Sequence, residues 1–151
     1  MAGIRGEDTR PELIIRHAMF LMGFRHRLGR NYRSEGHLLP GRPDLVYPRY
    51  HAVIQVNGCF WHKHGCQLFK WPSTRQEFWR EKLSGNALRD RRNQEKLEAM
   101  GWRVLTVWEC ALKGRARRDF LEVINTAANW LQYDHGSAEI AGTGVADVRG
   151  G

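Results

Sequence analysis

The sequence predicts a small α/β domain in which a short mixed β-sheet is flanked by helices. Apolar residues recur at helical spacing in the first and last thirds of the chain, and strand-like segments lie between them. At 151 residues, with 42% hydrophobic residues, the chain is long enough for one domain with a core of its own. We expect that domain to cover residues 1–133, followed by a disordered, glycine-rich tail at 134–151.

The composition favours a polyanionic partner. Twenty-four Lys and Arg residues against sixteen Asp and Glu residues give a net charge of +8 and a pI near 9.9, as in many proteins that bind nucleic acid. No apolar run approaches the roughly 18 residues that a membrane span requires, and the amino terminus lacks a signal pattern. We therefore expect a monomeric cytoplasmic protein that has no contact with a membrane.

The first predicted element is an amphipathic helix. Thr9 is its expected N-cap, Glu12 stands where a capping box places a carboxylate, and Gly23 ends the apolar repeat. Apolar and basic residues alternate over 24–28, which predicts a half-buried strand. The polar, arginine-rich stretch 29–39 predicts a loop.

The next elements predict a hairpin. Prolines and a glycine at 40–43 force a turn, and apolar strands at 45–47 and 51–57 follow around a proline bend. Such a hairpin holds Asp44 near the end of the second strand.

The second half of the chain returns to helices around one further strand. A capping box at 72–77 predicts the start of a helix, which Gly85 and Asn86 interrupt before a charged helix runs to Met100. The segment 102–108 is the most strand-like in the chain. A final amphipathic helix is expected at 115–133.

The densest set of metal-binding side chains follows the hairpin directly. Cys59 and Cys66 lie in one short loop with His62 and His64, and Cys110 follows the later strand. Three thiolates and one imidazole form a common closed zinc site. Either histidine could complete it, so the spacing leaves one imidazole unassigned. The alternative interpretation is three buried cysteines and two solvent-exposed histidines.

The unassigned imidazole and Asp44 together suggest phosphodiester hydrolysis. Histidine can take a proton from water near neutral pH. A carboxylate at the start of a strand is a ligand that Mg²⁺ uses, with backbone carbonyls and waters completing its coordination. The alternative interpretation of Asp44 is a turn or strand cap.

Aromatic and basic side chains near these residues also have two interpretations. Phe60 and Trp61 either cover a core or enter a base step and unstack it. Arg89, Arg91 and Arg92 form either a solvated helix face or a set of phosphate contacts. On a basic chain we expect Arg89 and Arg92 to contact DNA.

Four motifs carry a resemblance to a known family. They are Leu-Pro-Gly-Arg-Pro-Asp at 39–44, Gly-Cys-Phe-Trp-His at 58–62, Phe-Trp-Arg-Glu-Lys at 78–82, and the segment 101–110. Over 1–114 the chain resembles the very short patch repair (Vsr) mismatch endonucleases. The resemblance implies a core like that of type II restriction endonucleases, a structural Zn²⁺, and Mg²⁺-dependent nicking of double-stranded DNA. The nick falls on the 5′ side of the thymine in a T:G mismatch, the product of 5-methylcytosine deamination, and mismatch-repair proteins are further expected partners.

The resemblance also implies which residues act. Asp44 would be the Mg²⁺ carboxylate, assisted by the main-chain carbonyl of Val56. His62 falls at the position of the catalytic histidine, and Glu12 falls at the carboxylate near it. The implied zinc ligands are Cys59, His64, Cys66 and Cys110.

Further implied roles concern the DNA. Phe60, Trp61 and Met1 fall where family members insert wedges beside the mismatch. Lys82 and Asn86 fall in the segment that faces the mismatched pair.

Two features depart from the family pattern. The position before Gly58 is often histidine, whereas Asn57 stands here among the catalytic residues; it can hydrogen-bond Glu12 but cannot carry a proton. The sequence also begins without the amino-terminal arm of many members, so we expect weaker DNA binding or a shortened chain. Two rival functions follow: a restriction-type or general nicking endonuclease without mismatch preference, and a zinc-stabilised DNA-binding module that has lost catalysis.

Overall fold

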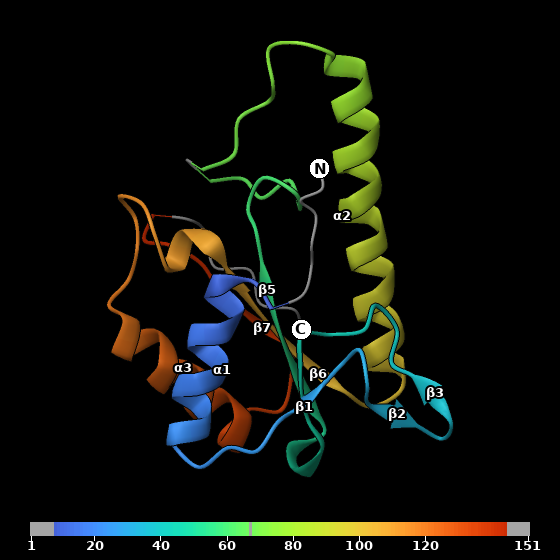
Figure 1. Cartoon of the computed structure of the whole chain (residues 1–151), viewed down its shortest axis with the longest axis vertical. Helices are drawn as coiled ribbons and strands as arrows, with labels where there is room; N and C mark the ends of the chain where they lie inside the picture. The colour runs from blue at the N-terminus through green and yellow to red at the C-terminus, as the bar shows by residue number, and fades with distance from the viewer. Residues whose placement is uncertain (1–7, 67, 145–151) are drawn as a thin grey trace.

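The centre of the computed structural model, which describes residues 8–66 and 68–144, is a five-stranded sheet with the order β1-β4-β5-β6-β7 (Figure 1). The strands are β1 (Arg27–Leu28), β4 (Leu45–Tyr47), β5 (Ala52–Asn57), β6 (Arg103–Trp108) and β7 (Ala138–Ile140). Neighbours from β1 to β5 are antiparallel, and neighbours from β5 to β7 are parallel. The sheet is therefore mixed, which confirms the predicted fold class.

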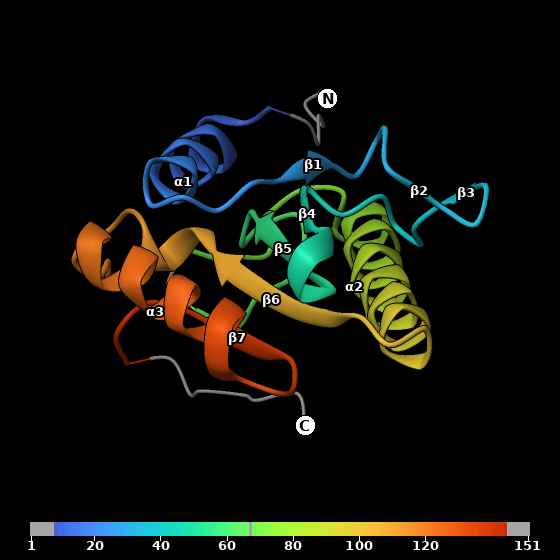
Figure 2. The ribbon, with the colours of Figure 1, turned by 90° about the horizontal axis from the view of Figure 1, so that it is seen from below.

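Helices cover both faces of the sheet (Figure 2). Helices α1 (Arg10–Leu21) and α3 (Phe120–Tyr133) pack on one face, and the long helix α2 (Gln76–Ala99) packs on the other. Among the described residues, no helix is both long and apolar enough to cross a membrane.

The alternation of side chains along the strands explains these layers. Leu45 and Ile54 belong to the larger core with α1 and α3, whereas Val46 and Val53 belong to a smaller core with Leu97 of α2. Successive residues of a strand point to opposite faces, so each strand feeds both cores. The register pairs Leu45 with Ile54 and Val46 with Val53, which confirms the predicted hairpin.

The start of α1 confirms the predicted cap. The Thr9 side chain accepts a hydrogen bond from the Glu12 N–H at 3.4 Å, and the Glu12 carboxylate accepts one from the Asp8 N–H at 3.1 Å. The strand expected at 24–28 is shorter, because only Arg27–Leu28 pairs with β4.

The stretch 29–39, predicted as a loop, contains a small hairpin. Its strands are β2 (Arg33–Ser34) and β3 (His37–Leu38), which pair only with each other. Strands of two residues carry no alternation that a sequence pattern could reveal.

Two predictions for α2 were wrong. The helix runs unbroken through Gly85 and Asn86, and its N-cap residue is Arg75, at φ 52° with no side-chain cap, where a capping box was expected. An interior glycine weakens a helix by only about 1 kcal/mol. Burial of Leu83 and Leu97, on either side of that point, offsets this loss.

The carboxyl-terminal segment needs two further corrections. Helix α3 begins at Phe120, not at 115, because the Asp119 carboxylate caps it by accepting the Glu122 N–H at 3.2 Å. The expected disorder after Asp134 is wrong for Ala138–Ile140, which pairs in parallel with β6 as the edge strand β7.

The larger core explains why β7 is ordered. Ala138 and Ile140 are buried in it. The Arg103 guanidinium of β6 donates hydrogen bonds to the carbonyls of Tyr50, Trp130, Leu131 and Asp134 at 2.9–3.0 Å. These bonds join the end of α3 to the sheet, so the chain enters β7 from a fixed point.

Candidate active site and metal-binding cluster

Four side chains of the two loop segments gather into one cluster, which we call the Cys/His cluster. It consists of Cys59, His64, Cys66 and Cys110, whose ligand atoms all lie within 4.8 Å of one another. The Cys59 and Cys110 sulfurs lie 3.4 and 3.6 Å from His64 Nδ1. Cys59 follows β5 and Cys110 lies in the turn Glu109–Ala111 after β6. Because β5 and β6 are parallel, their ends meet at one edge of the sheet and bring these residues together.

The surroundings of the cluster suit a metal. Cys59 and Cys110 are fully buried, and the His64 ring stacks on Trp108 with centroids 3.9 Å apart. Burial lowers the pKa of His64, so its ring stays neutral and keeps a lone pair. Burial also raises the pKa of the Cys59 and Cys110 thiols, and a bound cation reverses that shift. The cluster can therefore hold a metal ion.

A cleft of about 520 Å³ opens between this loop, the β4–β5 hairpin and α2, and both Asp44 and His62 line it. We call it the Asp44–His62 cleft. The Val56 N–H donates a hydrogen bond to Asp44 Oδ2 at 2.7 Å, which fastens the carboxylate to the end of β5. The structure thus places Asp44 where the hairpin predicted it.

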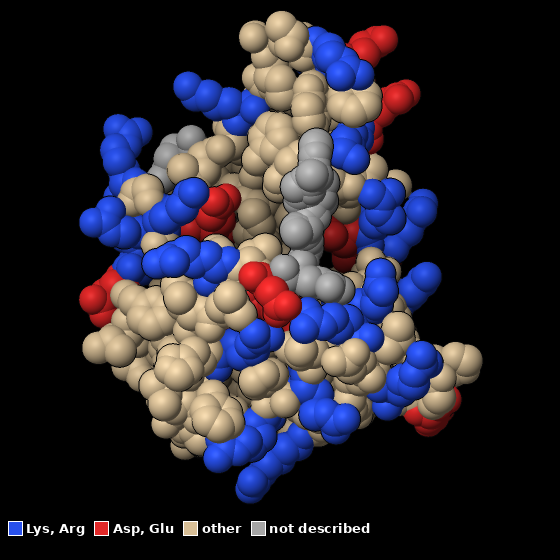
Figure 3. Space-filling view, in the orientation of Figure 1, with Lys and Arg blue, Asp and Glu red and all other residues tan. Residues whose placement is uncertain are grey.

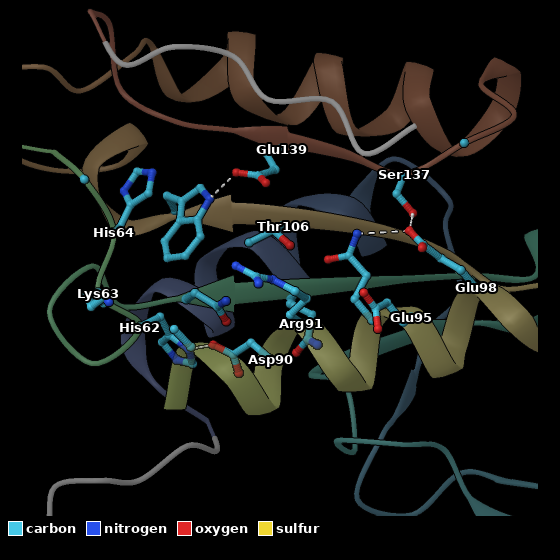
Figure 4. A pocket seen from close by; sticks show the side chains of 17 residues that line it. His62, Lys63, His64, Asp90, Arg91, Glu95, Glu98, Thr106, Ser137 and Glu139 are labelled. Atoms are coloured by element: carbon cyan, nitrogen blue, oxygen red, sulfur yellow. Dashed lines mark hydrogen bonds and ion pairs between the residues drawn. The ribbon is translucent and has the colours of Figure 1, made fainter. Parts of the chain in front are cut away.

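His62 has a partner that the sequence analysis missed. Its Nδ1 faces Asp90 Oδ2 of α2 at hydrogen-bonding distance (Figure 4). Asp90 is the single carboxylate between Lys82 and Gln94, in a segment rich in arginine. That isolation is the only feature of the sequence that singles out Asp90, and it does not identify His62 as its partner.

A second hollow, of about 730 Å³, lies on the other side of the His62–Asp90 pair, between α2 and strands β5 to β7. Arg91 projects into it (Figure 4). The Ser137 hydroxyl donates a hydrogen bond to the Glu98 carboxylate at 2.7 Å. On the wall of the hollow opposite α2, Trp108 Nε1 donates a hydrogen bond to the Glu139 carboxylate at 2.8 Å. Arg91 therefore faces a different opening from the Asp44–His62 cleft.

Phe60 and Trp61 line the Asp44–His62 cleft and are half-buried. Their ring centroids lie 5.1 Å apart, and each ring contacts Trp79 of α2, at 5.5 and 5.9 Å. The Asn86 side chain donates to the Trp61 carbonyl at 3.0 Å. Trp79 thus joins the predicted wedge residues, and Asn86 holds their backbone.

Glu12 and Asn57 are not joined in the described structure. Glu12 is only 2% exposed, receives the Asp8 N–H and lies 3.6 Å from Arg16 Nη1. A hydrogen bond to Asn57, which the sequence allows, is absent among the described residues. Burial raises the pKa of Glu12. Asn57 lines both the cleft and the second hollow, whereas Glu12 is not among the described residues that line the cleft.

The other predicted DNA contacts lie on the surface of α2. Lys82, Arg89 and Arg92 are exposed, and Arg89 also donates to the Asn86 side chain. Lys and Arg side chains are spread over the face shown in Figure 3. Met1 lies outside the described residues.

Comparisons with known proteins identify the family of the chain. A sequence model of the family "DNA mismatch endonuclease Vsr" matches residues 1–68. The DNA mismatch endonuclease Vsr of Escherichia coli is 46% identical over 117 residues, which are 78% of this chain and 75% of that protein. Two proteins named as type II nicking enzymes are also similar. V.XorIIP of Xanthomonas oryzae is 42% identical over 74% of this chain and 78% of its own length, and V.NmeAIP of Neisseria meningitidis is 38% identical over 77% and 79%.

The named relatives are DNA endonucleases, and a basic α/β fold with an aspartate and a histidine in one cleft is compatible with that class of enzyme. Within that class, the chain belongs to the Vsr family of DNA mismatch endonucleases, whose core is like that of restriction endonucleases.

Proposed function

We propose that this endonuclease nicks one strand of double-stranded DNA on the 5′ side of the thymine in a T:G mismatch, in a reaction that requires Mg²⁺. The observation that carries the proposal is the cleft in which Asp44 and His62 lie beside the rings of Phe60 and Trp61. The E. coli relative is named a mismatch endonuclease and the Xanthomonas relative a nicking enzyme, which supports action at a mismatch and cutting of one strand.

Zn²⁺ is the ion that best suits the Cys/His cluster. Zn–S bonds of about 2.3 Å and Zn–N bonds of about 2.0 Å in a tetrahedron separate sulfur from nitrogen by about 3.5 Å. The observed separations of 3.4 and 3.6 Å from His64 Nδ1 fit that edge. Since 60–62 lies between two of the ligands, the cluster would hold the wedge rings and His62 in place.

Asp44 and the Val56 carbonyl are the proposed ligands of Mg²⁺, which prefers oxygen and keeps several waters. The N–H and C=O of one strand residue point to the same edge. The Val56 N–H reaches Asp44, so its carbonyl faces the same side. When bound, Mg²⁺ would neutralise charge on the phosphodiester and acidify a coordinated water.

His62 is the proposed general base. A hydrogen bond from His62 Nδ1–H to the Asp90 carboxylate would leave Nε2 of the neutral ring with its lone pair. Nε2 would take the proton of the attacking water as the new O–P bond forms, and the departing oxygen would gain a proton from solvent. Asn57 cannot transfer a proton, so this chain would rely on one titrating side chain.

Recognition of the mismatch is assigned to the aromatic wedge and to α2. Phe60 and Trp61, backed by Trp79, would enter the base step and unstack it. Lys82 would face the mismatched pair, while Arg89 and Arg92 would contact phosphates.

Nicking assays on one duplex, carrying T:G, T:A or C:G at a single position, test the proposal. Cutting of the T:G duplex alone, lost on removal of Mg²⁺, is the expected result. Equal cutting of all three would instead support a general nicking endonuclease. Binding without cutting, with Mg²⁺ present, would support a zinc-stabilised DNA-binding module.

A further inference from the structure

Arg42 lies two residues before Asp44 and lines the same cleft. The described residues that line this cleft include three carboxylates, those of Asp44, Asp90 and Glu109, and Arg42 is their only Lys or Arg. A phosphodiester that enters such a cleft adds more negative charge. A cation beside it would offset that charge, and Arg42 is the residue of the lining that carries one.

The Arg42 side chain is exposed, and its guanidinium has no hydrogen bond, ion pair or ring contact among the described residues. Only the backbone is engaged, through the N–H that donates to the Leu39 carbonyl at 2.9 Å. By contrast, Arg16 and Arg30 pair with the Asp8 carboxylate at 3.3 and 3.1 Å. The planar guanidinium of Arg42 thus keeps its donors for a ligand, and its fork matches two oxygens of a phosphate.

The backbone of Arg42 adopts a conformation that costs stability. Its φ is +44°, in the left-handed region, where a side chain is strained by about 1–2 kcal/mol. The turn packs closely against neighbouring residues at two points. A Cβ on Gly41 would lie 2.8 Å from the Asn93 amide, and one on Gly29 would lie 1.7 Å from the Pro43 carbonyl oxygen. Glycine at position 42 would relieve the strain, so this position allows the arginine side chain to be removed without straining the backbone.

We propose that the Arg42 guanidinium binds the non-bridging oxygens of the phosphodiester that is cut, which makes Arg42 a further catalytic residue. Its N–H donors would strengthen their hydrogen bonds as negative charge grows on those oxygens during attack by water. This proposal rests on the proposed nuclease function of the cleft, but not on a preference for T:G.

The test replaces the side chain without straining the backbone. Arg42→Gly keeps the left-handed turn and should melt at the same temperature as the parent protein, or higher. Its single-turnover nicking rate at saturating enzyme should fall about 10²-fold or more, as for the loss of one transition-state donor. Arg42→Lys should recover part of the rate, because it restores the charge but not the fork.

Two control variants separate this effect from loss of a turn side chain or of charge. Glu35→Gly changes another exposed left-handed residue, at φ +52° between β2 and β3. Arg49→Ala removes one exposed cation at the other end of the β4–β5 hairpin. Both should nick at the parental rate.

The outcomes are distinct. An Arg42→Gly rate within about threefold of the parent, or a loss that saturating enzyme abolishes, overturns the proposal, since one donor should contribute about 10²-fold. The assay uses whichever duplex the parent protein cuts, so loss of T:G preference alone leaves the Arg42 test intact. A parent protein that cuts no duplex contradicts the proposed function itself, and with it the role of Arg42.

Discussion

His62 and His64 stand two residues apart on one loop, yet their surroundings are opposite. His64 lies flat on Trp108, and its Nδ1 faces the sulfurs of Cys59 and Cys110. His62 faces Asp90 and borders both openings, whereas His64 borders only the second hollow. One imidazole is built into a buried cluster, and the other is presented to a cleft.

The difference shows that the neighbouring side chains, and not the residue type, decide the role of each histidine in this loop. The Cys/His cluster joins the ends of β5 and β6, so a short loop without helix or strand can still hold a side chain in place. His62 lies between Cys59 and His64 of that cluster in the sequence, yet its side chain stays partly exposed. The variants below should therefore separate chemistry from stability.

The largest expected effect concerns His62, the histidine that borders the cleft. His62→Ala should lower the single-turnover nicking rate by about 10³-fold or more, because general-base catalysis contributes about 10²–10⁴-fold and no other side chain is assigned to that task. Asn57→Ala, the matched variant in the same cleft, should lower the rate less than about tenfold, because Asn57 transfers no proton. The reverse ranking would refute the assignment of His62.

The next largest effect concerns the buried Cys/His cluster. Cys110→Ser should abolish tight metal binding and lower the free energy of unfolding by about 3–4 kcal/mol, the stabilisation expected from a ligand at 100 to 1,000 times its dissociation constant. Thermal unfolding and measurement of bound zinc check this, with His62→Ala as the control that keeps both. A Cys110→Ser protein that lacks zinc but melts with the parent would contradict a structural role for the metal.

The affinity of the Cys/His cluster for metal should fall as the pH falls. Burial raises the pKa of the Cys59 and Cys110 thiols, so near neutral pH both carry protons that the metal must displace, whereas His64 is already neutral. Each drop of one pH unit should therefore weaken zinc binding by at least about 10²-fold, tenfold for each of these two displaced protons. Competition with a chromophoric chelator at several pH values measures this; an affinity independent of pH would be inconsistent with thiolate ligands.

The smallest expected effect is at Glu12. Glu12→Gln keeps an acceptor for the Asp8 N–H but removes a buried charge. Since burial raises the pKa of Glu12, the ionised form is less favourable in the folded chain than in the unfolded one, and stability near pH 7 should not fall by more than about 1 kcal/mol. A loss of nicking above about 10²-fold at unchanged melting temperature would favour the catalytic role that the resemblance implies.

Local patterns were enough for much of the fold. The α1 cap at Thr9, the strand at 102–108 and the β4–β5 hairpin all follow from neighbouring residues, and the structure confirms them. The hairpin also explains why Asp44 could be placed beside the end of β5 in advance. The unbroken course of α2 and the strand β7 could not be predicted, because contacts with distant residues outweigh weak local signals there.

By itself, the sequence determined the mixed α/β class, the basic character and the set of residues that could bind metal, because these depend on composition and on short spacings. Only the tertiary structure decided that Asp90 faces His62, that Arg91 faces away from the cleft, and that Arg42 is the only Lys or Arg among the described residues that line it. Those facts depend on how α2 and the turn before β4 pack against one sheet edge. No local pattern encodes that packing, because it is set by side chains far apart in the chain.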